Sequence, residues 1–212
     1  APAALRWMIN TVFMAVMSMI LTCITAAMAG YALAKKRFVG RKLLFTLIVC
    51  AMALPKQVIL IPLLREMSSL NLYNTIWAVI FPIVGWPFGV FLMKQFYEGV
   101  PTELCEAARI DGLSEYGIWW HIMLPLSLPA LSTLTIFTFV NTWNDFLGPL
   151  IYLTKTELKT IQIGLRMFIT QYSAEYGLIM AASVVALIPV LIVFLSLQKY
   201  FVQGVASTGI KG

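Results

Sequence analysis

Long apolar segments separated by short polar ones dominate the pattern along the chain. A bilayer core about 30 Å thick is crossed by a helix of roughly 20 apolar residues, and five segments reach that length. The pattern therefore predicts an all-α fold, a polytopic bundle of transmembrane helices. The predicted spans cover residues 7–33, 43–64, 75–96, 126–153 and 177–201.

Helix-breaking residues occur inside and between these segments. Prolines are tolerated in membrane helices because neighbouring helices can bond the freed carbonyls. Gly85 and Gly89 form a GxxxG pattern that would allow close helix approach. Kinked helices fit a bundle that bends while it works, and they also fit a static one. The prolines are Pro55, Pro62, Pro82, Pro87, Pro129, Pro149 and Pro189.

The composition excludes a soluble domain of this length. Hydrophobic residues make up 60% of the 212 residues and charged residues only 11%, whereas soluble domains contain about 45–50% and about 25%. Nine acidic and fifteen basic residues are too few to cover the wet surface of such a domain. The chain is therefore predicted to be surrounded by membrane lipid.

The net charge of +6 is concentrated between the first two predicted spans. Such a basic cluster is typical of a cytoplasmic loop under the positive-inside rule. Nucleic-acid binding would need a folded basic face, so we expect no nucleic-acid partner. The cluster contains five of the fifteen bases: Lys35, Lys36, Arg37, Arg41 and Lys42.

The basic cluster also predicts the orientation of the other loops. Residues 97–125 then lie inside and residues 154–176 outside, and the tail from Gln198 to the C-terminus lies in the cytoplasm. An outside start with five spans is unusual for a whole protein. Because residues 1–4 also contain no methionine, we expect one more spanning helix upstream of this single membrane domain.

The loop of residues 97–125 is far longer than a connection between two helices requires. Pro101 suits a first helical turn, and acidic residues near a helix start complement its dipole. Gly112 can adopt the left-handed conformation that ends a helix. The pattern predicts a short helix, a sharp turn and a second short helix over residues 113–123. Ala107 and Ala108 would leave a surface with little side-chain bulk, against which another protein could sit.

This loop resembles the motif of ABC-importer permeases: Glu-Ala-Ala, three residues, Gly, nine residues, Ile, one residue and Leu-Pro. Every fixed position and every gap match. The resemblance implies a type I ABC importer fold, with six spans in the subunit, and makes this loop the coupling helix that inserts into an ATPase subunit. An amphipathic surface helix, the alternative, would not require this spacing. The residues implied in ATPase coupling are Glu106, Ala107, Ala108, Arg109, Asp111, Gly112, Ile122, Leu124 and Pro125.

Two other segments resemble carbohydrate-importer permeases of the maltose type. They are residues 141–150 and the chain end, 198–204 with 209–212. The resemblance implies a sugar or oligosaccharide substrate, a second permease subunit, two ATPase subunits that bind ATP and Mg, and an extracellular or periplasmic solute-binding protein. It also implies a bacterial cytoplasmic membrane and no cofactor in this chain. Importers of amino acids, peptides or phosphate share the Glu-Ala-Ala loop and are the nearest alternative.

Polar groups near the fourth predicted span are candidates for the substrate path. Ionisable groups at membrane depth usually face a polar cavity or a partner. Amides can form hydrogen bonds with sugar hydroxyls, and aromatic rings can stack on sugar rings. The candidates are Asn141, Trp143, Asn144 and Asp145. An interhelical hydrogen bond, or a place for Asp145 at the outer interface, is the alternative. Lys56 could pair with an acid of a partner subunit or extend toward the interface.

The predicted outer loop, residues 154–176, ends with Tyr172, Glu175 and Tyr176. By resemblance, this loop contacts the solute-binding protein. A solvated re-entrant turn is the alternative.

The sequence contains no arrangement typical of an enzyme. There is no phosphate-binding GxxxxGK[ST] segment, and no nucleophile–base pair is recognisable. Cys23, Cys50, Cys105 and His121 lack metal-ligand or disulfide spacing. We therefore expect no catalytic residue and no metal site, and we expect ATP hydrolysis to be carried out by partner subunits. An intramembrane enzyme, or a purely structural subunit, is a more distant alternative.

Overall fold

The computed structural model describes residues 2–171 and 176–208, and this part of the chain is helical without any strand. It forms two compact units. The first comprises Ala1–Ile20, Lys56–Val84 and Ile136–Ser196, and the second comprises Leu21–Pro55, Gly85–Thr135 and Leu197–Gly212. The all-α prediction is confirmed.

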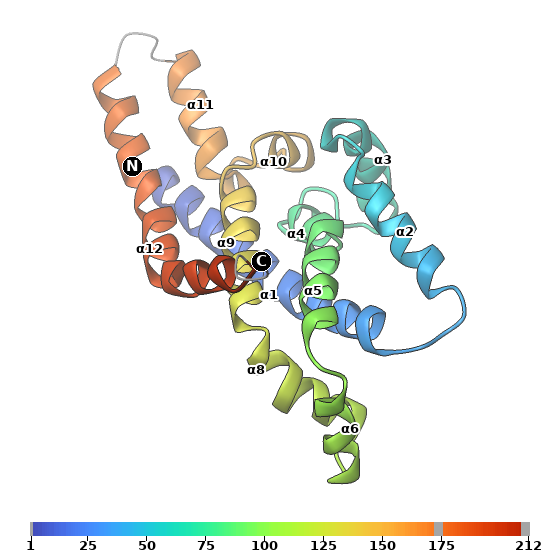
Figure 1. Ribbon diagram of the computed structural model, residues 1–212. Helices are drawn as coiled ribbons and strands as arrows, with labels where there is room; N and C mark the ends of the chain where they lie inside the picture. Colours follow the sequence, from blue (N-terminus) through green and yellow to red (C-terminus); the bar gives the residue numbers. More distant parts are fainter. Residues whose placement is uncertain (1, 172–175, 209–212) are drawn as a thin grey trace. The chain divides into compact units, whose positions relative to one another are not determined.

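The helices follow one another with short connections (Figure 1). Two segments differ from α-helix: Trp119–Met123 is a π-helix and Thr156–Leu158 a 3₁₀-helix. The α-helices are α1 Pro2–Lys35, α2 Arg41–Met52, α3 Lys56–Ser69, α4 Trp77–Val84, α5 Pro87–Gly99, α6 Glu103–Ile110, α7 Glu115–Ile118, α8 Leu124–Leu126, α9 Leu128–Trp143, α10 Leu147–Tyr152, α11 Ile161–Gln171 and α12 Tyr176–Thr208.

Three helical segments within the described residues are long and apolar enough to cross a bilayer: Ala3–Lys35, Trp77–Gly99 and Met180–Lys199. Two further pairs of helical segments are each bent at a short break, and the number of spans rises to five if each pair is counted as one span. The bend is 110° between α2 and α3, and 77° between Glu115–Leu126 and α9. The predicted number of five is therefore reached only when both bent pairs are counted, and the second of these pairs begins before the predicted fourth span.

The segment predicted as one span over residues 43–64 is divided into α2 and α3 by a sharp bend. Pro55 lies in the break between the two helices. Proline has no amide hydrogen to donate, and its ring disfavours a helical conformation of the preceding residue. A hydropathy pattern detects apolar length, but it does not show whether the apolar segment runs straight.

The fourth predicted span ends ten residues earlier than expected, because α9 stops at Trp143. Asp145 lies in the break that follows, and its Oδ1 accepts a hydrogen bond of 3.4 Å from the Gly148 backbone N–H. Short polar side chains compete in this way with the helical backbone. The chain then restarts as the six-residue α10.

The core of the second unit joins α1 and α5 to the segment that follows α6. Gly30 of α1 lies so close to α5 that an added Cβ would be 2.6 Å from Met93 Cβ. At Gly89 an added Cβ would be 3.1 Å from Ala26 Cβ, whereas Gly85 has no neighbour within 4 Å. The GxxxG prediction is thus right for Gly89 and wrong for Gly85, and among the described glycines of this unit the closest approach is at Gly30. The cluster consists of Ala26, Ala27, Tyr31, Met93, Tyr97, Cys105, Ala108, Ile118, Trp119, Met123, Ala130 and Leu134.

The core of the first unit surrounds Trp143, which is 1% exposed. Its ring stacks on Phe139 with centroids 5.6 Å apart. Its indole N–H donates to the Ala186 carbonyl of α12 at 3.0 Å. The burial of this large aromatic group joins α9 to α12 within the unit.

Candidate functional site

The predicted helix–turn–helix of residues 97–125 is present as α6, a turn at Gly112, and α7. Gly112 has a φ of 84°, in the left-handed region, as expected. An added Cβ there would meet nothing within 4 Å, so glycine is required by backbone conformation and not by packing. Pro101 lies two residues before α6 and not in its first turn. Ser114 begins α7 by accepting a hydrogen bond from the Gly117 N–H.

One face of α6 packs against the protein and the other faces outward. Cys105 and Ala108 are buried, at 0% and 3% exposure, whereas Ala107 is exposed. The expectation that both alanines lie on the exposed surface is therefore wrong for Ala108, because a helical step of 100° separates neighbouring side chains. The apolar side chain of Ile110 is 87% exposed at the end of α6.

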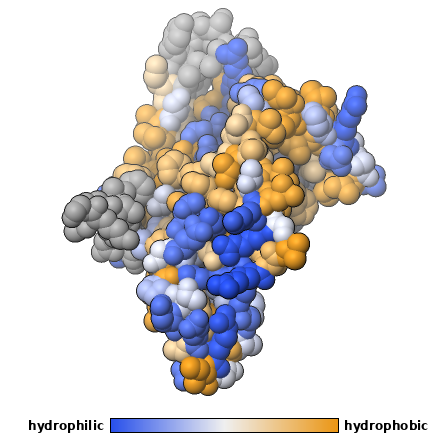
Figure 2. Space-filling model, turned by 45° about the vertical axis from the view of Figure 1, so that its right-hand side comes forward, coloured by the Kyte–Doolittle hydropathy of each residue, from blue (hydrophilic) through white to orange (hydrophobic). Residues whose placement is uncertain are grey.

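The exposed side of α6 is mixed in character. Figure 2 shows apolar atoms at the lower end of the molecule, where Figure 1 places α6, with hydrophilic residues around them. Exposed apolar side chains next to charged ones are typical of protein–protein contact surfaces. The exposed residues of α6 are Glu103, Leu104, Glu106, Ala107, Arg109 and Ile110.

The second half of the motif lies on the π-helix and α8. Trp119 and Met123 are buried in the core of the second unit. Of the motif positions, Ile122 and Leu124 are half-buried and Pro125 is exposed. Met123 also contacts Cys105 of α6, with their sulfur atoms 3.7 Å apart. The motif therefore connects an exposed helix to a packed one.

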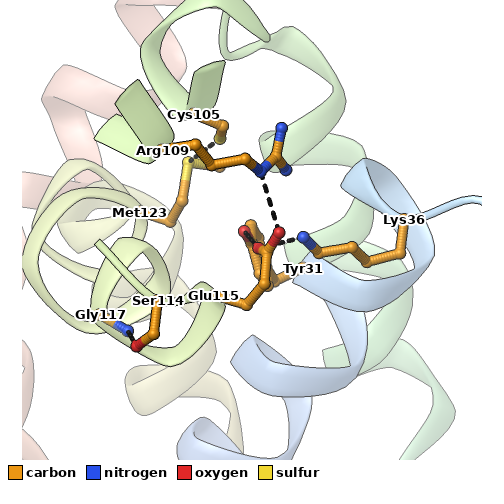
Figure 3. Close-up of polar contacts among 8 residues, drawn as sticks. All are labelled: Tyr31, Lys36, Cys105, Arg109, Ser114, Glu115, Gly117 and Met123. Carbon is orange, nitrogen blue, oxygen red and sulfur yellow. Dashed lines mark hydrogen bonds and ion pairs between the residues drawn. The ribbon is translucent and has the colours of Figure 1, made fainter. Parts of the chain in front are cut away.

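Glu115 joins α1 to this loop (Figure 3). Its carboxylate forms ion pairs with Lys36 and with Arg109, the latter at 2.9 Å, and accepts a hydrogen bond of 3.0 Å from the Tyr31 hydroxyl. The Lys36 ammonium, the Arg109 guanidinium and the Tyr31 hydroxyl lower the pKa of Glu115 to about 2. A second link runs from the Lys35 ammonium to the Val100 carbonyl.

Glu115 is a functional candidate that the sequence pattern did not identify. It lies outside the motif positions, and no spacing distinguishes it from the other acidic residues of the loop. Its contacts with Lys36 and Tyr31 arise because the turn at Gly112 brings α7 back against the end of α1.

The substrate-path candidates fall into two groups. Asn141 and Asn144 are exposed. Trp143 is packed in the core of the first unit, and its N–H is already bonded to the Ala186 carbonyl. It therefore positions α9, while the two amides and Asp145 remain as groups that could meet a polar solute.

Lys56 and Asp145 form an ion pair within this chain. Lys56 Nζ lies 2.7 Å from Asp145 Oδ2, and the side chains are 53% and 9% exposed. The expectation that Lys56 pairs with a partner subunit or only extends toward the interface is therefore corrected. For Asp145, the structure agrees with the alternative prediction of a bond between helices, because the ion pair joins the start of α3 to the break between α9 and α10.

The described part of the predicted outer loop is bonded to the beginning of α1. Trp7 Nε1 donates to the Thr156 carbonyl at 2.8 Å, and Asn10 Nδ2 donates to the Glu157 carbonyl at 2.7 Å. Tyr172 and Glu175 lie outside the described residues. Tyr176 begins α12, but its side chain is also outside the described part.

Within residues 2–171 and 176–208, no three His, Cys, Asp or Glu side chains gather as metal ligands would.

Comparison with known families gives one match over most of the chain. The family described as "Binding-protein-dependent transport system inner membrane component" matches residues 24–207. The matched range includes the helix–turn–helix, Glu115 and the Lys56–Asp145 pair.

Individual relatives are also similar over nearly the whole chain. The arabinooligosaccharides transport system permease AraQ of Halalkalibacterium halodurans is 39% identical, over 97% of this chain and 74% of the relative. The lactose transport system permease LacG of Rhizobium radiobacter is 33% identical, over 92% and 71%. A crystal structure of a bacterial ABC transporter involved in the import of the acidic polysaccharide alginate matches with a TM-score of 0.82 and 26% identity, over 95% of this chain and 76% of that one.

Proposed function

This chain belongs to the family of binding-protein-dependent transport system inner membrane components, and from that premise we propose that it is the permease subunit of an ATP-driven importer of a sugar or short oligosaccharide. The observation that carries the proposal is the Glu-Ala-Ala motif, with an exposed α6 connected through Glu115 to α1. The sugar class is supported by relatives whose names specify arabinooligosaccharides and lactose.

The exposed side of α6 serves as the docking surface for an ATPase subunit. Ala107 adds almost no bulk, and Ile110 presents an apolar group at the end of the helix. Buried apolar anchors surrounded by polar contacts are typical of such interfaces. ATP and Mg bind to the ATPase subunits, and this chain hydrolyses nothing itself.

Glu115 transmits the movement of the docked helix to the membrane bundle. When the ATPase subunits close on ATP, α6 is displaced, and Arg109, Glu115 and Lys36 connect it to the end of α1. The bundle then alternates between outward and inward openings. ATP drives this shift because it binds the two states with different affinity.

The solute path includes the exposed amides Asn141 and Asn144 and the carboxylate of Asp145. Amides can donate and accept hydrogen bonds at once, as a sugar hydroxyl can. Trp143 holds these residues in place by its packing and its bond to Ala186.

The basic cluster at the end of α1 supports the proposed orientation, because basic loops beside a span stay in the cytoplasm. The same end of α1 bonds to Val100 and Glu115. Residues 97–125 then face the cytoplasm together with the basic cluster. Alternation of the spans assigns residues 154–176 to the outside and the C-terminus to the cytoplasm.

The proposed complex also contains a second permease subunit and an external solute-binding protein. Tyr172, Glu175 and Tyr176 are the proposed contacts with the binding protein, since they end the outer loop. The comparisons support the coarser statement that such permeases work as parts of binding-protein-dependent systems.

Uptake measurements test the substrate class. Cells that carry the complete transporter should accumulate radiolabelled arabino-oligosaccharides or disaccharides. Cells with a hydrolysis-deficient partner ATPase should not. Accumulation of a labelled amino acid or phosphate, with no sugar uptake, would contradict the sugar proposal.

Cysteine labelling tests the orientation independently. In a chain with Cys23 and Cys50 replaced by alanine, Ile110→Cys should react with a membrane-impermeant maleimide only after the cells are permeabilised. Thr154→Cys should react in intact cells. Labelling of Ile110→Cys from outside would remove α6 from the cytoplasm, and the ATPase-docking proposal would fail with it.

A further inference from the structure

The five bases of the α1–α2 loop divide into two groups with different surroundings. Lys35 and Lys36 bond to Val100 and Glu115 and belong to the helix–turn–helix connection. The others, Arg37, Arg41 and Lys42, line an open pocket of about 510 Å³ together with Phe38, Gly40 and Leu43. We name these six residues the basic pocket.

The basic pocket carries three positive charges and no acidic residue. Arg37 and Lys42 are exposed, and within the described residues neither has an ion-pair partner. Arg41 is held in place because its Nη1 donates to the Lys36 carbonyl at 2.9 Å. Three bases with this arrangement favour an anion with several acceptor oxygens.

Apolar side chains lie directly beside these charges. Val39 is fully exposed, and Leu43 is 65% exposed. The apolar surface continues along α2 through Leu44 and Leu47, since α2 has no buried residue. A ligand that matches both surfaces has an anionic head and an apolar tail.

The position of the pocket in the chain favours a lipid over a soluble anion or a protein. It begins two residues after the end of α1, which is long and apolar enough to cross the bilayer. Figure 1 shows the loop leaving the end of α1 and turning back into α2. Basic residues directly beside a span lie at the level of the phospholipid phosphates. A soluble anion would leave the apolar surface of α2 uncovered.

We propose that the basic pocket binds an anionic phospholipid. The phosphate contacts Arg37, Arg41 and Lys42, and the acyl chains lie along Leu43 and Leu47. This interaction is separate from solute transport, and its test requires no transport measurement.

Native mass spectrometry of the full chain tests the proposal. The chain is released from nanodiscs that contain equal amounts of phosphatidylglycerol and phosphatidylcholine, and the bound lipids are counted. We expect the native chain to retain phosphatidylglycerol preferentially. Each base near an anionic membrane surface strengthens attraction about fivefold, so the double variant Arg37→Gln/Lys42→Gln should lower the preference by up to about twenty-five-fold.

Two control variants make the outcome specific. Arg6→Gln/Arg65→Gln removes the same charge from exposed positions elsewhere and should keep the preference. Arg37→Lys/Lys42→Arg preserves the charge and should also keep it. An equal loss in the Arg6/Arg65 variant would show a general charge effect and overturn the proposal. Retention of the lipid preference in the Arg37→Gln/Lys42→Gln variant would also overturn the proposal. The same holds if binding of a partner ATPase depends on Arg37 and Lys42 while lipid binding does not.

Discussion

Lys56 Nζ lies 2.7 Å from Asp145 Oδ2, although the two residues are 89 positions apart in the sequence. They are also unequally exposed, since the Lys56 side chain is 53% exposed and the Asp145 side chain 9%. The Lys56 ammonium is only partly covered by this chain, whereas the Asp145 carboxylate is almost completely enclosed by it. The two halves of this pair should therefore differ in their importance for stability.

Replacing Lys56 with methionine should destabilise the chain more than replacing Asp145 with asparagine. The first change leaves a nearly buried carboxylate without its partner, which costs about 1–3 kcal/mol. The second leaves a half-exposed ammonium, and an exposed pair contributes about 0–1 kcal/mol. Thermal unfolding of the purified chain in detergent measures both. The double variant Lys56→Met/Asp145→Asn should recover most of the loss, and equal effects of the two single changes would contradict the assignment.

Gly148→Ala should also disturb the Lys56–Asp145 ion pair, because Gly148 lies against the Asp145 carboxylate. An added Cβ would lie 2.7 Å from Asp145 Oδ2, too close for a carboxylate that also bonds to Lys56. We expect a lower unfolding temperature in Gly148→Ala. Adding it to Asp145→Ala should cause little further loss, because the obstructing oxygen is gone. An additive loss in that double variant would show that Gly148 is required for another reason.

Gly30→Ala should destabilise the contact between α1 and α5. The new Cβ would lie 2.6 Å from Met93 Cβ and 2.8 Å from the Lys94 backbone nitrogen, so backbone atoms would have to move. Overpacking typically costs about 1–3 kcal/mol, and an unyielding backbone favours the upper end. Gly85→Ala, with nothing within 4 Å, should be nearly neutral in the same unfolding measurement. Similar losses in both would refute the close approach at Gly30.

Glu115→Gln should uncouple ATP hydrolysis from transport. Loss of the ion pairs to Lys36 and Arg109 would loosen the connection of α6 to α1, so solute moved per ATP should fall several-fold in proteoliposomes. Binding of the ATPase subunits, measured by co-purification, should persist. Glu66→Gln, an exposed position without a side-chain ion pair among the described residues, is the matched control. Unchanged transport per ATP in Glu115→Gln would disprove the proposed transmission.

The turn at Gly112 can be tested by a graded pair of substitutions. Its φ of 84° is accessible to asparagine but strongly disfavoured for a β-branched residue. Gly112→Val should abolish ATP-driven uptake while the chain still inserts into the membrane, and Gly112→Asn should retain a large part of it. Equal uptake by both variants would show that the left-handed turn is unnecessary.

Local features of this fold could be predicted from the sequence. Among the described residues, apolar length located the helical segments that are long enough to span a bilayer, and Gly112 indicated a left-handed turn, because these properties depend on neighbouring residues alone. The bend of 110° at Pro55 was harder to predict, since proline marks a possible break without setting its angle.

Features that depend on tertiary contacts could not be predicted. Lys56 and Asp145 were recognised as unusual charges, but nothing local pairs residues so far apart. The burial of Ala108 and the role of Glu115 both follow from how α6 and α7 turn back onto the protein. A motif specifies which residues occur at which spacing, and the fold decides which of them face inward.

The widened turn at Trp119–Met123 has a consequence for the length of the motif. The Leu124 N–H bonds to the Trp119 carbonyl, so this turn holds one residue more than an α-helical turn would. In a regular α-helix the additional residue would rotate the preceding segment by about 100° about the helix axis, and the wider turn takes up most of this rotation. The direction in which Glu115 points, toward Lys36, therefore depends on the wider turn as well as on the nine-residue gap between glycine and isoleucine.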